Sequence, residues 1–450
     1  MGNGILGRRE LLRIGFVGSA SALSVVALAG CGDEKAEAPA AAAPAAEKAP
    51  PAEKAAPAAE EKPATVEISY LNWAGSEVGE EGMNKIMDAF HASTPHIKVQ
   101  MENLPFTQAQ DKFVTLHAAG ALTDAIQIGF WQLQEFYDLG MIREVDSMAA
   151  AAGFDWDAYA GPLKNEIEGK RIVVPMSTIV GLNHFNVTTF EDAGVAGPPD
   201  TWEEHTETAL KITDPEKFKY GLTHAWGLED PRLSSQLYPE IWQAGGEVEN
   251  ADGTFASNTP EGLKALEYVL SLELEHDVVV PGSLNAVETT QIENFGSGTA
   301  GMFYDNSAHL NLYLGREDLV FDVGPPLKDQ TRAGFVFGWR NSVAETSKHP
   351  QEAFDFLAWI AGVEGNTMLA SIGTQVPANK HAKPTYSSPA LGALVDTAIK
   401  WATFDGAHGA AGLCEVQVVF AREIHEAING NATAQEVLDA TEAKWNAIVG

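Results

Sequence analysis

Residues 66–71 read Val-Glu-Ile-Ser-Tyr-Leu, a stretch in which apolar and polar side chains alternate. Alternation with a period of two predicts a β-strand that buries one of its faces. The next predicted elements alternate in type: they are a helix, a strand, a helix and a strand at residues 83–90, 96–101, 113–119 and 125–128. Strands that alternate with helices indicate an α/β fold, in which a mostly parallel sheet is flanked by helices.

The loops after the first and third predicted strands are the first candidates for a binding site, because ligands of parallel sheets lie beyond the carboxyl ends of the strands. The first loop contains Trp73 and Glu77, and the second contains Phe130, Trp131 and Gln132. Flat aromatic rings stack on the apolar faces of sugars, while carboxylate and amide groups bond sugar hydroxyls. Both loops therefore carry the two kinds of side chain that a sugar site needs.

The globular part of the chain begins near residue 65 and is too long for one ordinary core, so two domains are expected. Hydrophobic residues make up 45% and charged residues 20% of the 450 residues, which are the values of a soluble globular protein. The formal net charge is −33. This excess of acidic residues argues against nucleic acid as a partner and against electrostatic attraction to anionic lipid.

Residues 1–31 predict a lipoprotein signal peptide. Arginines at positions 8, 9 and 13 supply a charged start, and residues 14–30 form a short run that is too weakly apolar for a membrane span. Small residues before a lone cysteine are typical of a bacterial lipoprotein, in which Cys31 is lipidated and becomes the first residue. The arginine pair resembles a twin-arginine export signal. A plain N-terminal membrane anchor is the alternative, and the choice between twin-arginine and general export stays open.

Residues 32–64 consist almost wholly of alanine, proline, glutamate and lysine. A segment without large apolar side chains cannot offset its ordering entropy, so we expect a disordered tether. Its prolines favour extended conformations and hence a semi-rigid spacer. The working part of the protein is therefore expected outside the cytoplasm and tied to a membrane, in the periplasm or on another extracytoplasmic face.

The chain lacks the common sequence motifs of enzymes and metal sites. No His-Glu-x-x-His, Gly-x-Ser-x-Gly, Walker loop or Cys-x-x-Cys occurs. Residues 296–301 match G-x-G-x-x-G, but a predicted helix precedes them and a predicted strand follows, the reverse of a dinucleotide site. Cys414 has no partner cysteine once Cys31 is lipidated, and we interpret it as a buried thiol rather than a nucleophile. We expect a binding protein with no catalytic residue, no cofactor and no metal.

Several further segments resemble the extracellular solute-binding proteins of ABC importers, in the large group that includes maltose-binding protein. Examples are Glu-Gly-Lys-Arg-Ile-Val-Val-Pro at residues 168–175 and Phe-Gly-Ser-Gly-Thr-Ala-Gly-Met at residues 295–302. The other segments follow in the family's order, at residues 124–128, 139–145, 183–186, 193–204, 347–353 and 428–446. Two positions depart from the family: Glu168 stands where aspartate is commoner, and His184-Phe185 stands where Tyr-Tyr is frequent. The second departure lies near the expected hinge and could alter the pocket.

The resemblance implies a two-lobed periplasmic-binding-protein fold of the class II type, with each lobe a mostly parallel sheet flanked by helices. Lobe I would comprise residues 65–177 and 334–375, and lobe II residues 178–333 and 376–450. The chain would cross between the lobes at three places, near Ser177-Thr178, Gly334–Trp339 and Gln375–Pro377. Closure about such a hinge brings contacts from both lobes onto one solute.

Resemblance and residue chemistry together select the candidate ligand-binding residues, most of which are aromatic or polar side chains in predicted loops. They are Trp73, Glu77, Phe130, Trp131, Trp226, Trp242, Gln243, Tyr304, Asp305, Trp339 and Arg340. Tryptophans also fill cores, and helical apolar spacing predicts that role for Trp202, Trp359 and Trp445, while Trp156 is expected to pack at the surface.

The predicted function is capture of a sugar or oligosaccharide and its delivery to the permease of an ABC transporter. The protein is expected to be a monomer, with the lipid on Cys31 as its membrane contact. One alternative is the same fold with another solute, such as glycerol-phosphate, a polyamine or a peptide. A second alternative is an exported glycosidase, which needs two facing carboxyl groups about 5 to 10 Å apart. Neither the identity nor the length of the sugar can be read from the sequence.

Overall fold

The computed structural model describes residues 64–129, 132–159, 166–386, 392, 399–404 and 413–449. The predicted signal peptide and nearly all of the predicted tether lie outside these residues, as do Phe130, Trp131 and the side chain of Cys414. The described residues belong to one compact unit, Lys62–Gly450. Among them, no helix combines the length and the apolar character that a membrane crossing requires.

The first elements have the order that the sequence predicts. The strands are β1 (Val66–Asn72), β2 (Ile97–Asn103) and β3 (Ala125–Ile128). The helices between them are α2 (Glu80–Ser93) and α3 (Phe106–Ala118). α3 begins earlier than predicted, directly after a proline, because its first turns are mostly polar and lack the apolar spacing that marks a helix.

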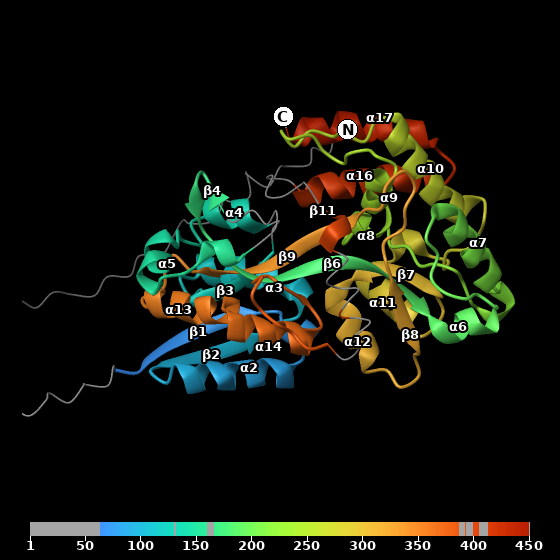
Figure 1. Ribbon diagram of the computed structural model, residues 1–450. Coiled ribbons are helices and arrows are strands. Elements are labelled where there is room, and N and C mark those ends of the chain that lie inside the picture. The colour runs from blue at the N-terminus through green and yellow to red at the C-terminus, as the bar shows by residue number, and fades with distance from the viewer. Residues whose placement is uncertain are drawn as a thin grey trace, which may run out of the picture. The chain divides into compact units, whose positions relative to one another are not determined.

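One mixed sheet joins most strands of the described residues, in the order β10-β6-β9-β3-β1-β2 (Figure 1). β1 pairs in parallel with β2 and with β3. β9 (Gly334–Val343) runs antiparallel to β3 and to β6 (Val174–Asn186), and β6 runs antiparallel to the short β10 (Val376–Pro377). The sheet is therefore parallel at β1 and mixed where β6 and β9 pass through it.

β6 connects two regions of the sheet. Its first half pairs with β9 and β10, and its second half pairs with β7 (Met302–Asn306) and β8 (Phe321–Gly324). We call β1 to β3 and the helices that pack on them the β1 side, and β7, β8 and their helices the β7 side. Thr178, near one predicted crossing, pairs with Gly338 of β9 and with Val376 of β10. The lobe boundaries themselves stay a prediction.

Helices cover both faces of the sheet on the β1 side (Figure 1). α13 (Pro350–Ala361) packs on β1, β3, β6 and β9, and α14 (Val363–Gly373) packs on α2. The ring of Tyr70 meets Phe356 of α13 edge to face, with the ring centroids 5.2 Å apart. Leu71 points to the opposite face of the strand and is equally buried, so both faces of β1 lie in the core.

The β7 side carries most of the remaining helices. They are α6 (Val187–Asp192), α7 (Trp202–Ile212), α8 (Leu233–Gln236), α9 (Tyr238–Gln243), α10 (Pro260–Leu274), α11 (Glu288–Gly296), α12 (Leu310–Leu314), α16 (Leu413–Ile428) and α17 (Ala434–Val449). The other short elements are α1 (Gly75–Val78), α4 (Leu133–Asp138), α5 (Asp146–Ala152), β4 (Glu166–Ile167), β5 (Lys170–Arg171) and β11 (Ala402–Phe404). α11 precedes the glycine-rich residues 296–301 and β7 follows them, which is the order predicted from the sequence. Gly298 has a φ of 70°, a backbone conformation that favours glycine, and it lies in the turn between α11 and β7.

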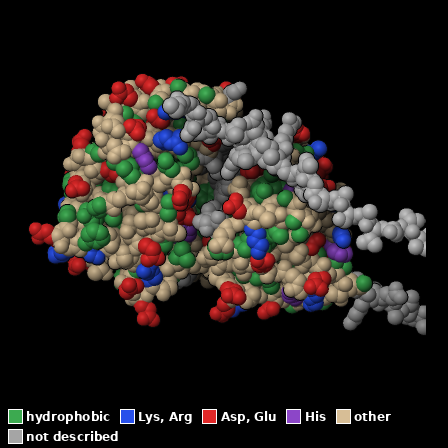
Figure 2. All heavy atoms as spheres, turned by 180° about the vertical axis from the view of Figure 1, so that it is seen from behind, with side chains coloured by type: hydrophobic (Ala, Val, Ile, Leu, Met, Phe, Trp, Pro, Cys, Tyr) green, Lys and Arg blue, Asp and Glu red, His purple; other side chains and the backbone are tan. Residues whose placement is uncertain are grey.

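The predicted core tryptophans are largely in place. Trp202 and Trp445 are buried, and Trp359 is partly buried against the same core. Trp156 is also partly buried, and the Arg171 guanidinium lies 4.8 Å from the centroid of its ring. Figure 2 shows acidic side chains spread over the whole visible face and few basic ones, in keeping with the negative net charge.

Candidate functional site

Glu77 lies on α1, immediately after β1, and its carboxylate is almost fully buried at 8% exposure. Its Oε2 accepts hydrogen bonds from Trp339 Nε1 and from Gln375 Nε2, both at 2.8 Å. Burial is the main cause that raises the pKa of this carboxyl to about 7, although His309, Trp339 and Gln375 favour the charged form. The first predicted loop therefore holds a buried carboxyl group that can titrate near neutral pH.

The β7 side reaches α1 through α12. Asn311 of α12 donates through Nδ2 to the carbonyl oxygen of Glu77 at 3.3 Å and to that of Ile372 at 2.7 Å. Thr374 Oγ1 in turn donates to Asn311 Oδ1 at 2.8 Å. One asparagine thus bonds a loop after β1 and the end of α14, so the two sides of the sheet meet beside Glu77.

Four further ionisable groups of the β7 side form a connected set near this meeting point, and two of them, His309 and Glu288, act on the charge of Glu77. His309 Nδ1 lies 2.8 Å from Asp305 Oδ2, and His309 Nε2 lies 3.8 Å from Glu288 Oε1. Arg232 Nη2 lies 2.6 Å from the same oxygen of Glu288. We call Glu77, Arg232, Glu288, Asp305 and His309 the junction cluster.

Opposite charges set the titration of the junction cluster. Burial opposes the charge of His309, but Asp305 and Glu288 outweigh burial and raise the pKa of His309 to about 9. Burial likewise opposes ionisation of Asp305, but His309 outweighs it and lowers the pKa of Asp305. Three carboxyl groups thus face two cations, and Glu77 is the member with the weakest compensation. The arrangement offers both acceptors and donors for a polar ligand.

The two tryptophans on the β1 side are packed rather than open. Trp73 is 0% exposed, and its ring meets Trp339 edge to face with centroids 5.5 Å apart. The backbone N–H groups of Trp73 and Ala74 donate to Gln127 Oε1 at 3.1 and 3.0 Å. Trp339 shows 6% of its surface. These rings support the loop that carries Glu77, and in this conformation neither offers a free stacking face.

Arg340 follows Trp339 on β9 and is 0% exposed. Its Nη1 donates to the carbonyl oxygen of Gly338 at 2.7 Å. Nε and Nη2 have no hydrogen-bond partner among the residues that the structure describes. Burial lowers the pKa of this guanidinium to about 9.

The candidates on α9 and before it are held by bonds inside the β7 side. Gln243 accepts from Trp202 Nε1 at 2.6 Å and donates to the carbonyl oxygen of Ala333 at 2.9 Å. Trp242 is 5% exposed. Trp226 is 0% exposed and donates to Glu273 at 2.6 Å. The structure thus does not bring Trp226 to the junction cluster.

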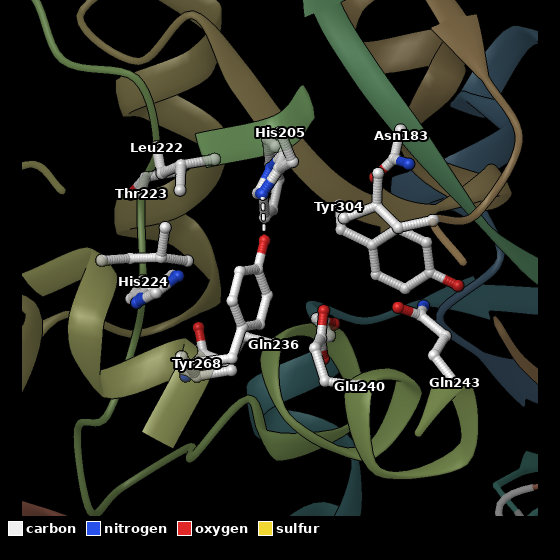
Figure 3. Close-up of a pocket in the computed structure, with 15 residues that line it drawn as sticks. Asn183, His205, Leu222, Thr223, His224, Gln236, Glu240, Gln243, Tyr268 and Tyr304 are labelled. Atoms are coloured by element: carbon white, nitrogen blue, oxygen red, sulfur yellow. Dashed lines mark hydrogen bonds between the residues drawn. The ribbon is translucent and has the colours of Figure 1, made fainter. Parts of the chain in front are cut away.

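A small cavity of about 30 Å³ lies within the β7 side (Figure 3). Gln243 and Tyr304 line one end of it, and Glu240 lies beside them. Toward the other end, the hydroxyl of Tyr268 lies 2.7 Å from His205 Nδ1 (Figure 3). A volume of this size holds about two water molecules and no sugar.

Several groups of this cavity are buried without full compensation. Glu240 Oε2, Ser235 Oγ and Tyr304 Oη have no hydrogen-bond partner among the described residues. Burial raises the pKa of Glu240 to about 7 and lowers that of His205 to about 3. A Cβ atom at Gly181 would lie 2.2 Å from Tyr304 Oη, so glycine is required where this tyrosine packs on β6.

Sequence reasoning singled out Glu77 and Asp305 but missed the rest of the junction cluster. Arg232, Glu288 and His309 are separated in sequence and look like ordinary members of a highly charged chain. The sequence signal for the cluster was that His309 follows Asp305 by four residues, just after β7. His184, which departs from the family pattern, packs on the ring of Tyr313, whose hydroxyl donates to Asp305 at 3.1 Å.

Among the described residues, no group of three His, Cys, Asp or Glu side chains is arranged to hold a metal ion. Of the predicted candidates, the structure brings Trp73, Glu77 and Trp339 together and places Asp305 in the junction cluster beside them. Phe130 and Trp131 lie outside the described residues.

The chain matches a known protein family and several known relatives. The profile of a family described as bacterial extracellular solute-binding protein matches residues 74–367. A Brucella abortus protein, named only as a binding protein without a stated ligand, is 25% identical over 308 residues, which cover 66% of this chain and 72% of that protein.

Two solved structures share the two-lobed fold. A solute-binding protein of an ABC transporter from Thermotoga lettingae, bound with α-D-tagatose, has a TM-score of 0.75 at 18% identity and covers 85% of this chain and 100% of its own. UgpB from Mycobacterium tuberculosis, in complex with glycerophosphocholine, has a TM-score of 0.72 at 13% identity, with coverages of 85% and 98%. At these identities the likeness concerns the fold alone.

Proposed function

Because this chain belongs to the family of bacterial extracellular solute-binding proteins, we propose that it captures a sugar or a related small polar solute and delivers it to the permease of an ABC importer. The observation that carries the proposal is the junction cluster. Glu77 comes from the β1 side, whereas Arg232, Glu288, Asp305 and His309 come from the β7 side. A solute bonded there contacts elements from both sides at once.

The chemistry of the cluster suits hydroxyl groups, which donate and accept. Glu77 and Glu288 accept hydrogen bonds from hydroxyl hydrogens, and Arg232 and charged His309 donate to hydroxyl oxygens. Because these groups come from both sides of the sheet, a solute that bonds groups of both sides binds the closed form more tightly than the open form. That differential affinity drives hinge closure.

The closed protein then presents its bound solute to the permease and releases it unchanged. The proposal includes export and anchoring: Cys31 carries the lipid, residues 32–64 act as a spacer, and the binding part works as a monomer at the membrane surface. Mass spectrometry of the purified mature protein checks the anchor. The expected N-terminus is a lipid-modified Cys31, and an unmodified chain that retains residues 1–30 would contradict it.

Thermal unfolding of the full-length protein against a solute panel tests the binding function. The panel comprises neutral sugars and oligosaccharides, sugar alcohols, sugar acids, glycerol 3-phosphate, polyamines and peptides. A ligand at 1,000 times its Kd stabilises the folded state by about 4 kcal/mol, which raises the unfolding midpoint by several degrees. We expect such a rise with one solute class, with the solute recovered intact.

A matched pair of variants locates the binding. Glu77→Gln is expected to lose most of the ligand-induced rise. Glu81→Gln, whose side chain is 86% exposed on α2, is expected to keep it. Consumption of the sugar overnight would make the protein an enzyme, and stabilisation by no member of the panel would refute the proposed ligand class.

A further inference from the structure

Arg340 differs in burial and in pairing from the partly exposed arginines of the described chain. Arg143, Arg171, Arg316 and Arg332 each lie beside a carboxylate. Arg340 has no carboxylate partner in the described part of the chain, and it is the arginine with no exposed surface. A buried charge without a partner costs several kcal/mol of stability. Such a residue is therefore a candidate for binding an opposite charge.

Arg232 differs from Arg340 because it has an acidic partner, Glu288. The Arg232 side chain is 15% exposed and is paired with Glu288 at 2.6 Å, although its Nε has no hydrogen-bond partner among the described residues. Burial opposes the charge of Arg232, and Glu288 and Asp230 outweigh burial and raise its pKa. Among the described residues no acid does this for Arg340, whose pKa burial lowers.

The free atoms of Arg340 have the geometry of a ligand contact. Nη1 donates to the carbonyl oxygen of Gly338, and within the described part of the chain Nε and Nη2 have no hydrogen-bond partner. These two nitrogens form one edge of the planar guanidinium, and their N–H bonds point the same way. That edge is the fork that binds a carboxylate or phosphate through two parallel hydrogen bonds.

The position of Arg340 in the fold is that of a ligand site. It pairs across the ladder with Ile128, the last residue of β3, at the carboxyl end where ligands of α/β sheets bind. Trp339, the preceding residue of β9, bonds Glu77 of the junction cluster, whereas the side chain of Arg340 points to the opposite face of this strand. Nη1 donates to the carbonyl oxygen of Gly338. Gly338 pairs with Thr178 at the point where the chain passes between the two sides. Hinge opening at this crossing is the motion that would expose the fork.

We infer that the fork of Arg340 receives an acidic group of the solute, so the cargo is a sugar acid or another small polar molecule that carries a carboxylate or a phosphate. This inference rests on the proposed function and narrows its solute class. The acidic group neutralises the charge of Arg340. A neutral sugar would leave the guanidinium buried and unpaired.

Titration calorimetry with pairs of solutes that differ only in the acidic group tests the inference. The pairs are D-galactose and D-galacturonate, D-glucose and D-glucuronate, and glycerol and glycerol 3-phosphate. We expect the acidic member of at least one pair to bind about 100-fold more tightly than its neutral partner, which is the effect of two charge-assisted hydrogen bonds. Arg340→Gln should reduce this preference to within a few fold.

Two further variants keep the test decisive. Arg340→Lys retains the charge without the fork and should recover only part of the preference. Arg143→Gln removes an arginine that already bonds the carbonyl oxygen of Ala344 at 3.2 Å, and it should leave the preference intact. If Arg340→Gln does not fold, the solute pairs on the unmodified protein still decide the question.

The outcomes separate the inference from the function. Equal affinity for acidic and neutral members overturns the role of Arg340 and leaves solute binding standing. Binding of inorganic phosphate, sulfate or chloride as tight as that of the sugar acids assigns the fork to a free anion and also overturns it. If no solute of either kind binds, the proposed function itself fails.

Discussion

Two buried carboxyl groups of this protein have a pKa near 7, yet their surroundings differ. Glu77 accepts two hydrogen bonds at a point where elements from the β1 side and the β7 side meet. Glu240 lies inside the β7 side, at a cavity of about 30 Å³, and one of its oxygens has no partner among the described residues. A shifted pKa therefore does not identify a ligand site by itself; the position between two movable parts does.

The charges of the junction cluster should be mutually dependent, and this is the largest effect we expect. Arg232→Met leaves Glu288, whose side chain is 17% exposed, with only the more distant His309, and should lower the free energy of unfolding by about 3 kcal/mol. Glu240→Gln removes a buried charge, one of whose oxygens has no partner among the described residues, and should not destabilise the protein at pH 8. Chemical denaturation at pH 8 compares the two variants. Equal losses of unfolding free energy in the two variants would contradict the proposed difference between the junction cluster and the cavity.

Ligand affinity should separate the two carboxyl groups. Glu77→Gln removes a charged acceptor and should weaken binding by about 30- to 100-fold, because hydrogen bonds to charged groups contribute about 1.5–3 kcal/mol. Glu240→Gln should change affinity by less than about threefold, since its cavity has no room for a sugar. Calorimetry with the solute that stabilises the protein most provides both values, and a large loss in Glu240→Gln would move the site into the cavity.

The pH dependence of stability should sharpen the same contrast. Glu240 binds its proton more tightly in the folded than in the unfolded protein, so folding stability falls as the pH rises from about 4.5 to about 7. Glu240→Gln should remove this loss of about 3 kcal/mol and be more stable than the parent at pH 8, with little difference at pH 4. Unfolding midpoints measured from pH 4 to pH 8 test this, and parallel curves for parent and variant would contradict it.

Asn311 should have the smallest effect of the series. Asn311→Ala removes the bonds from α12 to Glu77 and Ile372 and should cost about 1 kcal/mol. Because these bonds join the two sides, the variant should also show faster hydrogen exchange of the amides of α1 and α12. Asn431→Ala, an exposed asparagine bonded to Glu426, serves as the control and should leave exchange there unchanged.

Much of the fold could be predicted from the sequence, because alternation and helical spacing are local signals. β1, β2 and β3 lie close to their predicted ranges. The antiparallel course of β6 and β9 was not foreseen, since pairing between strands so far apart in sequence leaves no local trace. Family resemblance supplied the two-lobed arrangement that periodicity could not.

The candidate site was only partly predictable, for the same physical reason. Glu77 follows a predicted strand and was found by that rule. Arg232 and Glu288 meet only through the packing of α8 and α11, and nothing in their local sequence marks them. The prediction of open aromatic stacking faces did not anticipate how fully Trp73 and Trp226 are enclosed by their neighbours.

The most direct test of the account is a crystal structure of the protein with the solute that gives the largest stabilisation. We predict that the solute lies between the β1 side and the β7 side, bonded to Glu77 and to at least one of Arg232 and His309. A solute that lies elsewhere, with Glu77 still bonded only to Trp339 and Gln375, would contradict it.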